Sequence, residues 1–236
     1  MVKLLRRLQT RRARDDSYLL HLPLRQAKIA VIDTETTGFH AHKGDEIISI
    51  GMVMLEKGEI REAFEQLVNP RRPIPPHISE LTGINSARVM DQPGICSLLP
   101  WLLSRLEGAI IAGHNVSFDV GFLNCALRKH RPMATPAFSG PGTGPAPLEI
   151  CLGKLLNPTL DVAQICSSLH LHLPGYSLDH LMSFFQAGDK NKRHTALGDA
   201  MAAAEILLYL LDVLEEQGIY TLSQLKTRLA SRNILI

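Results

Sequence analysis

The chain has 236 residues, 45% of them hydrophobic and 20% charged, with a formal net charge of +2, and this composition excludes a chain that is disordered throughout. Its most apolar stretch, residues 204–214, is interrupted by Glu205 and Asp212, so a membrane-spanning helix is not expected. No signal-peptide pattern is present and the four cysteines form no C-x-x-C pair, which predicts a soluble, cytoplasmic protein without a disulfide framework or a zinc knuckle.

Positive charge is concentrated at the start of the chain. Residues 1–28 contain eight Lys or Arg and two Asp, which leaves four net negative charges on the remaining residues. Among residues 1–14 the basic side chains alternate with leucines, as in a short amphipathic helix that lies on nucleic acid, an acidic partner or a membrane surface. A solvated terminal arm is the alternative.

Hydrophobic patterns predict three strands at the start of the chain and a mixed order after them. Residues 27–32 (AKIAVI) form a buried strand that leads into the polar DTETTG, and residues 46–54 and 58–68 complete an antiparallel meander. A Pro-rich stretch, 69–76, leads into a short helix around residues 79–81. One further strand is predicted at 109–112, and helices are predicted at 97–107, 116–129, 178–186, 196–217 and 221–230.

A loop is predicted at residues 132–147, which contain five Pro and three Gly. With strands first and mixed strand–helix units after them, the order of elements favours an α/β fold in which helices cover both faces of a mixed sheet.

Two acidic residues stand at the end of the first predicted strand. Asp33 and Glu35 are two positions apart, and the period of a strand sends both side chains to the same face. Their repulsion is costly unless a cation compensates it, and carboxylate oxygens are ligands that suit Mg²⁺ or Mn²⁺. A D-x-E pair alone is weak evidence for a metal site, because exposed strands often carry one.

Three more polar residues occur in later segments. Asp119 lies near the start of a predicted helix, where the helix dipole stabilises an acid even without a catalytic role. His194 precedes Asp199 by five residues, which corresponds to ~140° on a regular helix, so the two would not share a face. We therefore expect His194 in the loop or first turn, from which it can approach a site that Asp199 reaches from inside the helix.

These residues form three ordered motifs that resemble those of a known family. Asp33 and Glu35 stand in D-x-E-T-T-G, and Asp119 stands in H-N-x-x-F-D. His194 and Asp199 stand in H-x-A-L-x-D-A. In this order the motifs resemble those of the DEDDh (DnaQ-like) 3′ to 5′ exonucleases, a family that includes the proofreading epsilon subunit of bacterial DNA polymerase III. The segments GDEIISIG and ELTGIN also look like the family's connecting segments.

The resemblance covers about residues 27–214 and implies a ribonuclease H-like fold, in which helices flank a central mixed five-stranded sheet. We therefore divide the chain into a basic N-terminal extension (1–26), an exonuclease domain (27–214) and a C-terminal helical tail (215–236). The resemblance also implies two divalent ions, Mg²⁺ or Mn²⁺, that activate water and stabilise the leaving oxygen. Their ligands would be Asp33, Glu35, Asp119 and Asp199, with His194 as the general base.

Substrate contacts also follow from the resemblance. In this family the segment matching Leu81, Thr82 and Gly83 lies against the terminal nucleotide, and the backbone after Glu35 contacts its sugar. The glycine permits a close approach of the chain, and Leu81 could wedge against a base. The residues expected to bind substrate are thus Glu35, Thr36, Leu81, Thr82, Gly83, Phe118 and His194. Packing on the sheet is an equal alternative for Phe118.

The expected function is metal-dependent release of nucleoside 5′-monophosphates from single-stranded or frayed DNA 3′ ends, in proofreading or repair. An exoribonuclease that trims RNA and a non-catalytic nucleic-acid-binding adaptor are the alternatives, and DNA is favoured over RNA. A polymerase or another replication protein could bind through the termini, and no membrane partner is expected. Residues 215–236 contain no evident clamp-binding peptide, so we expect a stand-alone or auxiliary enzyme rather than the replicative proofreader.

The remaining histidines and the candidate capping residues are predicted to have structural roles. The pairs His40-x-His42 and His170-x-His172 lack nearby cysteines, which disfavours structural zinc. His114 is expected to be a structural hydrogen-bonding residue. Ser177 and Asp161 fit helix caps or turns, and neither Asp161, Tyr176 nor Asp179 is assigned to catalysis.

Overall fold

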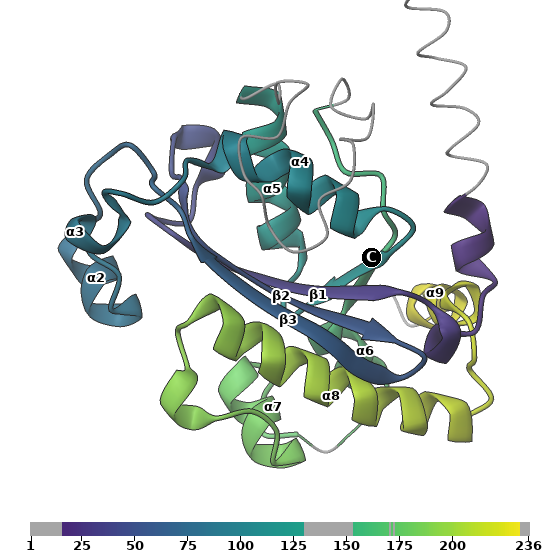
Figure 1. The fold of residues 1–236 in the computed structure, drawn as a ribbon. Coiled ribbons are helices and arrows are strands. Elements are labelled where there is room, and N and C mark those ends of the chain that lie inside the picture. Colours follow the sequence, from purple (N-terminus) through teal and green to yellow (C-terminus); the bar gives the residue numbers. More distant parts are fainter. Residues whose placement is uncertain (1–15, 130–152, 170, 172, 232–236) are drawn as a thin grey trace, which may run out of the picture.

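A five-stranded mixed sheet forms the centre of the protein (Figure 1). The structure is a computed structural model that describes residues 16–129, 153–169, 171 and 173–231. The strand order is β3-β2-β1-β4-β5; β2 lies antiparallel to both β1 and β3, whereas β4 is parallel to β1 and β5. The strands are β1 (Ile29–Thr36), β2 (Ile47–Glu56), β3 (Glu59–Leu67), β4 (Ile110–Gly113) and β5 (Thr159–Asp161).

The expected meander and mixed sheet are confirmed, with two differences. β1 continues through the polar motif to Thr36, because its backbone still pairs with β2 at Asp33 and Glu35. The short strand β5 has no counterpart among the segments predicted from hydrophobic pattern. Three residues give too little sequence for a period to be read, and β5 is defined by its pairing with β4.

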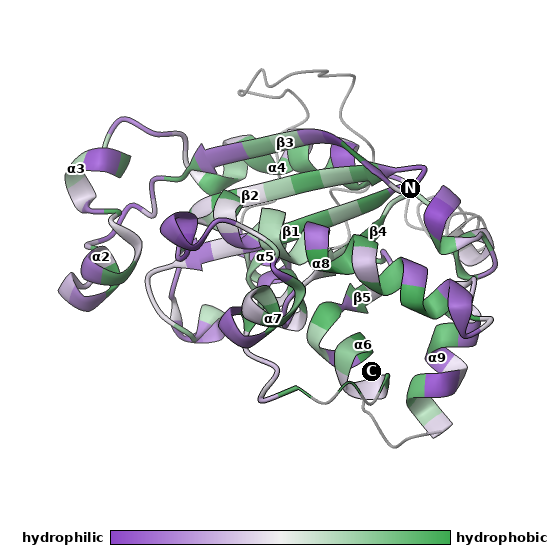
Figure 2. Cartoon of the chain, turned by 90° about the horizontal axis from the view of Figure 1, so that it is seen from below, coloured by the Kyte–Doolittle hydropathy of each residue, from purple (hydrophilic) through white to green (hydrophobic). Residues whose placement is uncertain are grey.

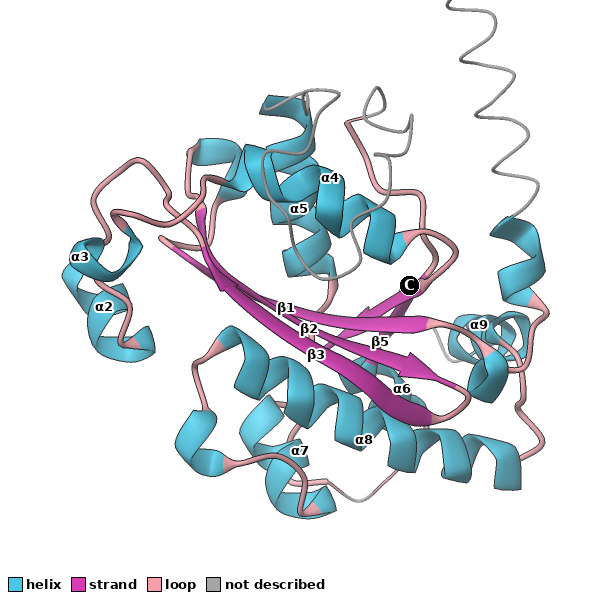
Figure 3. Ribbon diagram, viewed as in Figure 1, coloured by secondary structure: helices cyan, strands magenta, loops and turns pink. Residues whose placement is uncertain are grey.

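Helices cover both faces of the sheet (Figure 3). One face packs against α4 (Ile95–Leu106) and α5 (Ser117–Lys129), and the other against the long helix α8 (Ala196–Glu216). The helices grouped around α8 are α6 (Val162–Ser168), α7 (Leu178–Phe185) and α9 (Leu222–Ser231). No helix in the described part of the chain is long and apolar enough to span a membrane.

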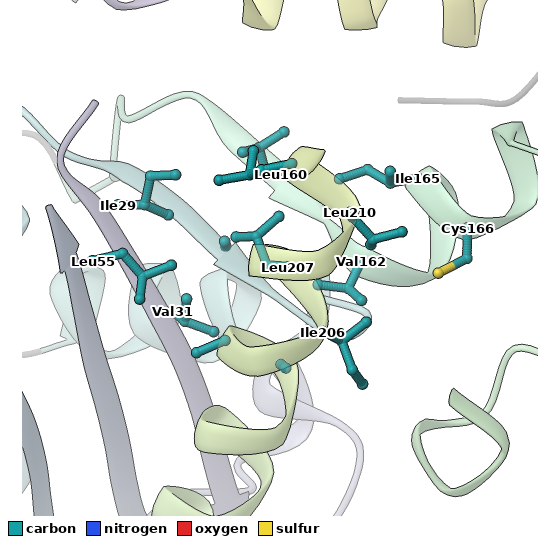
Figure 4. Packing of buried hydrophobic residues seen from close by; sticks show 14 of the residues in the cluster. Ile29, Val31, Leu55, Leu160, Val162, Ile165, Cys166, Ile206, Leu207 and Leu210 are labelled. Carbon is teal, nitrogen blue, oxygen red and sulfur yellow. The ribbon is translucent and has the colours of Figure 1, made fainter. Parts of the chain in front are cut away.

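Strand β1 is buried on both faces, and its alternation fixes where its side chains point. Ile29 and Val31 belong to the apolar core beneath α8, and Figure 4 shows them on the side of Leu207 of that helix. Ala30 and Ile32 belong to the core beneath α4 and α5. Each fully buried valine or isoleucine side chain of this kind contributes about 1.5–3 kcal/mol. Figure 2 shows the hydrophobic residues along β1 and the mixed, partly hydrophilic edge strand β3.

A small lobe of two short helices stands beside the end of β1 (Figure 1). It consists of α2 (Pro76–Thr82) and α3 (Ser86–Val89), so the predicted short helix is confirmed. Gly83 ends α2 at a φ of 69°, a conformation that glycine adopts without a steric cost. The lobe has its own apolar cluster, which reaches the sheet at Ile48: Ile48, Ile74, Ile78, Ile84 and Val89.

Segments from the two ends of the described chain pack together on the α8 side of the sheet. Two 3₁₀ helices, η1 (Asp16–Leu20) and η2 (Leu24–Gln26), precede β1. The Leu24 backbone N–H donates to the Tyr220 carbonyl over 2.7 Å, and Leu24 shares a core cluster with Leu225 of α9. The boundaries at residues 26 and 214 remain predictions, and the basic residues 1–14 and the loop 132–147 lie outside the described residues.

Candidate active site

The acidic residues of the three motifs meet where β1 ends. Following the alternation of β1, Asp33 and Glu35 face the α8 side, whereas Thr34 faces α5. Asp199 lies in the first turn of α8. Carboxylate oxygens of Asp33, Glu35 and Asp199 all lie within 4.8 Å of one another. The structure thus brings together three of the four predicted metal ligands in one group.

Asp119 approaches this group from the opposite face of the sheet. It lies in the first turn of α5 and is 2% exposed. The Thr34 hydroxyl donates to Asp119 Oδ1 over 2.7 Å, which ties the helix to the strand between the two other acids. Burial raises the pKa of Asp119 to about 7, with the charge of Glu35 adding to the shift and the Thr34 hydrogen bonds opposing it.

Burial and like charge act together on the two acids of β1. Burial raises the pKa of Glu35 to about 7, and the charge of Asp199 raises it further while that of Arg193 opposes the shift. The pKa of Asp33 is raised well above its ordinary value by burial, followed by the charges of Asp119 and Asp199. Arg193 therefore compensates the negative charge of these carboxylates only in part, and a bound cation would relieve the remainder.

The donor set fits a hard divalent cation. Asp199 Oδ1 is buried and has no hydrogen-bond partner among the residues that the structure describes. A buried carboxylate oxygen without a donor is costly, and coordination would satisfy it. Oxygen-only ligands from converging carboxylates are those that Mg²⁺ and Mn²⁺ prefer.

Gly51 lets α8 come close enough to place Asp199 in the group. It pairs directly with Asp33 in the β1–β2 register. A Cβ at Gly51 would lie 2.2 Å from the carbonyl carbon and oxygen of Ala196, the first residue of α8. Only a glycine fits between the strand and the helix backbone here. Sequence reasoning missed this role, although the glycine is part of the GDEIISIG segment.

His194 lies just before α8, as the five-residue spacing predicts. Thr195 is the N-cap of the helix and accepts from the Gly198 N–H over 3.1 Å, so His194 remains outside the helix. The backbone of His194 has a φ of 60°, in the left-handed region that non-glycine residues seldom occupy. Arg193 lowers the pKa of Asp179 and His194 contributes to the same shift, so the imidazole lies within electrostatic reach of α7.

Arg193 contributes an ion pair that sequence reasoning missed. Its Nη1 contacts Asp199 Oδ2, and its Nε donates to Asp179 Oδ1 over 2.6 Å. Asp179 stands in the first turn of α7 and has no catalytic role in the sequence prediction. The charge next to His194 in the KRH segment was the available signal for Arg193, but its partners depend on how α7 packs against α8.

The residues expected to contact a nucleotide surround the same end of the sheet. Leu81 is 50% exposed at the end of α2. Thr82 is buried and its hydroxyl donates to the Ile78 carbonyl, so its side chain supports the lobe. Thr36 is also buried, with its hydroxyl donating to the Gly38 carbonyl over 2.6 Å. A pocket of about 320 Å³ lies between β3, the lobe and the start of α8, and Thr82, Arg88 and Thr195 are among its lining residues.

Phe118 makes contacts that fit both roles considered for it. Its ring centroid is 4.9 Å from that of Phe122, a core residue, and 6.3 Å from that of Phe39. Phe39 is 74% exposed. Phe118 therefore packs on the core and also borders an exposed aromatic residue after β1.

The predicted structural residues are found in supporting roles. Nε2 of His114 lies 2.7 Å from the Tyr176 carbonyl, so this histidine links the segment before α5 to the segment before α7. Ser177 caps α7, and Asp161 caps α6 while its other oxygen accepts from the Val116 N–H. His170 and His172 lie outside the described residues.

Comparison with known protein families matches the part of the chain that carries the three motifs to one family. The family model described as "RNase_T: Exonuclease" matches residues 30–207 and so includes all five polar residues of the three motifs. The chain belongs to this exonuclease family. The resemblance to DnaQ-like exonucleases is thereby confirmed.

Relatives of this exonuclease chain include proteins named after a DNA polymerase. It is 34% identical over 210 residues to a PolC-type DNA polymerase III of Caldanaerobacter subterraneus, covering 89% of this chain and 13% of that protein. It is 33% identical over 225 residues to a DNA polymerase III subunit epsilon-like protein of Rhodobacter capsulatus, covering 94% of this chain and 29% of that protein. The exonuclease chain therefore spans less than a third of the length of these curated relatives.

Solved exonuclease structures share the fold. Exonuclease X, in a complex with 5′ overhanging duplex DNA, superimposes with a TM-score of 0.57 at 22% identity over 85% of this chain and 99% of that one. Exonuclease I of E. coli, in a complex with a dT13 oligonucleotide, gives a TM-score of 0.62 at 16% identity over 82% of this chain and 43% of that one. The expected ribonuclease H-like fold is confirmed by these likenesses.

Proposed function

We propose that this exonuclease is a metal-dependent 3′ to 5′ enzyme that releases nucleoside 5′-monophosphates from single-stranded or frayed DNA 3′ ends. The observation that carries the proposal is the meeting of Asp33, Glu35 and Asp199 within 4.8 Å, with Asp119 behind Thr34. Carboxylates so arranged raise one another's pKa and suit a cation rather than a structural ion-pair network.

Asp33, Glu35, Asp119 and Asp199 would hold two divalent cations, Mg²⁺ or Mn²⁺. Such ions, when bound, supply an activated water and positive charge for the scissile phosphate. Burial of Asp119 and Asp199 excludes competing water from these oxygens, and the Thr34 hydroxyl keeps Asp119 directed at β1. The site thus has the ligands and the enclosure that a phosphodiesterase requires.

His194 is the proposed general base. An imidazole changes charge near neutral pH and can accept the proton that the attacking water loses. Its position outside α8 leaves the side chain free of the helix face that carries Asp199. The left-handed backbone at this residue supports the proposal, because strained conformations collect at functional sites.

The terminal nucleotide would lie between the lobe and the start of α8. Leu81 is exposed for contact with a base, and the pocket beside Thr82 and Thr195 has the volume for part of a nucleotide. DNA is the proposed substrate over RNA because the structural neighbours Exonuclease I and Exonuclease X were solved with DNA. The PolC-type and epsilon-like relatives support a polymerase or another replication protein as a partner in the cytoplasm.

End-labelled substrates test this proposal directly. The purified protein is incubated with 5′-labelled single-stranded DNA, duplex DNA with a 3′ mismatch, and RNA, each with Mg²⁺, Mn²⁺ or a chelator. We expect a ladder shortening from the 3′ end of DNA, with loss of activity in the chelator. Asp33→Asn should lower the rate by at least about a thousandfold, since one of the carboxylates that would hold the water-activating cations is lost.

Asp91→Asn, which changes an exposed acid that follows α3, is the matched control and should leave the rate unchanged. Continued hydrolysis by a folded Asp33→Asn variant would show that the site is wrong. Tight DNA binding without any hydrolysis by the unmodified protein would favour the adaptor function, and faster degradation of RNA would favour an exoribonuclease.

A further inference from the structure

Arg193 places a positive charge next to the carboxylates of Asp33, Glu35 and Asp199. Among the described residues, one ion pair involves the predicted metal ligands (Asp33, Glu35, Asp119 and Asp199). It joins Arg193 to Asp199. The arginine side chain is 16% exposed and that of Asp199 is 10% exposed. A contact so shielded from water resists screening far more than a surface ion pair.

The guanidinium is held at two points. Nε donates to Asp179 Oδ1 over 2.6 Å on α7, while Nη1 contacts Asp199 Oδ2 on α8. Because the guanidinium is planar and its donors are fixed relative to one another, anchoring Nε at Asp179 fixes the direction of Nη1. The first turns of α7 and α8 are thereby connected through one rigid group.

The two oxygens of Asp199 have different surroundings. Oδ2 is taken by Arg193, whereas Oδ1 is buried without a hydrogen-bond partner among the described residues. The charges of Asp199 and Arg193 act on Glu35 with opposite signs, so both lie within electrostatic reach of β1.

We propose that Arg193 is a positioning residue of the site: by holding Oδ2, it turns Oδ1 of Asp199 toward Asp33 and Glu35 and strengthens the affinity of the group for a divalent cation. This inference rests on the proposed function, because it assumes that these carboxylates bind metal. It assigns to Arg193 and Asp179 a role outside the three exonuclease motifs.

Two physical effects of Arg193 on metal affinity have opposite signs. Its positive charge repels a cation, so charge alone predicts that removing it tightens metal binding. Its hydrogen bond orients a ligand, and loss of such an outer contact weakens metal affinity by about 10–100-fold. Orientation prevails here, because without Arg193 the carboxylate of Asp199 can rotate and its buried Oδ2 loses its donor.

Calorimetric titration with Mn²⁺ alone, in the absence of DNA, distinguishes the two effects. Arg193→Met should raise the dissociation constant for Mn²⁺ by about tenfold or more. Arg193→Lys keeps the charge but cannot bridge Asp179 and Asp199 in the same geometry, and it should weaken binding to a smaller extent. Lys190→Met removes an exposed charge from the preceding 3₁₀ helix (η5, Lys190–Lys192) and should leave the affinity unchanged.

Circular dichroism and the melting temperature of each variant establish that it is folded before titration. Unchanged or tighter Mn²⁺ binding by folded Arg193→Met would overturn the inference and identify Arg193 as a competitor of the cation. In that case the unmodified protein would still bind Mn²⁺ and the proposed function would stand. Failure of the unmodified protein to bind Mn²⁺ would contradict the proposed function and this inference with it.

Discussion

The carboxyl groups of β1 and α5 make the metal-free fold sensitive to pH. Burial and like charge raise the pKa of Glu35 and of Asp119 to about 7, and that of Asp33 well above its ordinary value. The folded protein therefore retains protons that the unfolded chain releases. Stability of the metal-free protein should fall as the pH rises above the ordinary carboxyl range, and the cost from Glu35 and Asp119 is fully present above about 7.

Glu35→Gln should reverse part of this cost. The variant removes one charge that the folded state disfavours. At pH 8 its metal-free melting temperature should therefore exceed that of the unmodified protein by a few degrees, since each kcal/mol of stability corresponds to about 2–4 °C. At pH 5 the difference should nearly vanish, because Glu35 is then protonated in the folded state. Thermal denaturation in chelator at the two pH values measures this, and an equal shift at both would contradict the charge argument.

Removing the Thr34 hydroxyl should lower the exonuclease rate, because this group orients Asp119. Thr34→Val keeps the shape of the side chain but leaves Asp119 Oδ1 without its 2.7 Å donor. We expect the exonuclease rate to fall by about 10–100-fold, as for other contacts that orient a ligand. Thr34→Ser restores a hydroxyl and should recover most of the rate in the same assay; a poor recovery would point to packing of the threonine methyl group instead.

At the scale of elements, the approach of α8 to β2 decides whether Asp199 reaches the site. Gly51→Ala would place a methyl group against the backbone of Ala196, which cannot yield as a flexible side chain can. The start of α8 must shift, so the rate should fall by at least about a hundredfold, since displacements near 1 Å cost that much. The melting temperature should fall as well.

Gly121→Ala in α5 is the matched control for this substitution. A Cβ there meets nothing within 4 Å, and alanine is favoured over glycine inside a helix by up to about 1 kcal/mol. This variant should keep full activity and melt at a slightly higher temperature. Similar losses in both variants would show that close packing at Gly51 is not the cause.

Local patterns in the sequence predict most of the elements but not the contacts between them. The apolar run at residues 27–32 predicts the strand, and the period of a strand predicts the shared face of Asp33 and Glu35 that follow it. Gly51, Arg193 and Asp179 were missed because their roles depend on how α7 and α8 dock on the sheet and on each other. Such distances between elements leave no period in the sequence. The ribonuclease H-like architecture and the roles of the acids came from the family resemblance.

At the scale of the whole molecule, α9 closes the core on the α8 side together with the segment before β1. Leu225 of α9 is 0% exposed and Leu24 is 3% exposed in the same core cluster. Leu225→Ala should cost about 2–5 kcal/mol. With about 2–4 °C per kcal/mol for a chain of this size, the melting temperature should fall by roughly 4–20 °C.

Activity at 25 °C should survive Leu225→Ala, because α9 contributes no residue to the carboxylate group. Tyr220→Ala, which truncates a side chain that is 50% exposed in the same region, should change the melting temperature little. Loss of activity at a temperature where Leu225→Ala remains folded would indicate that the tail acts on the site directly.

The acids proposed to bind metal belong to layers on opposite sides of the sheet. Asp119 comes with the layer of α4 and α5, Asp199 comes with the layer of α8, and β1 lies between them with two more. A nascent chain that has docked either layer alone has an incomplete set of ligands. Nuclease competence therefore coincides with completed folding, and partly folded chains emerging from the ribosome pose little danger to the nucleic acids around them.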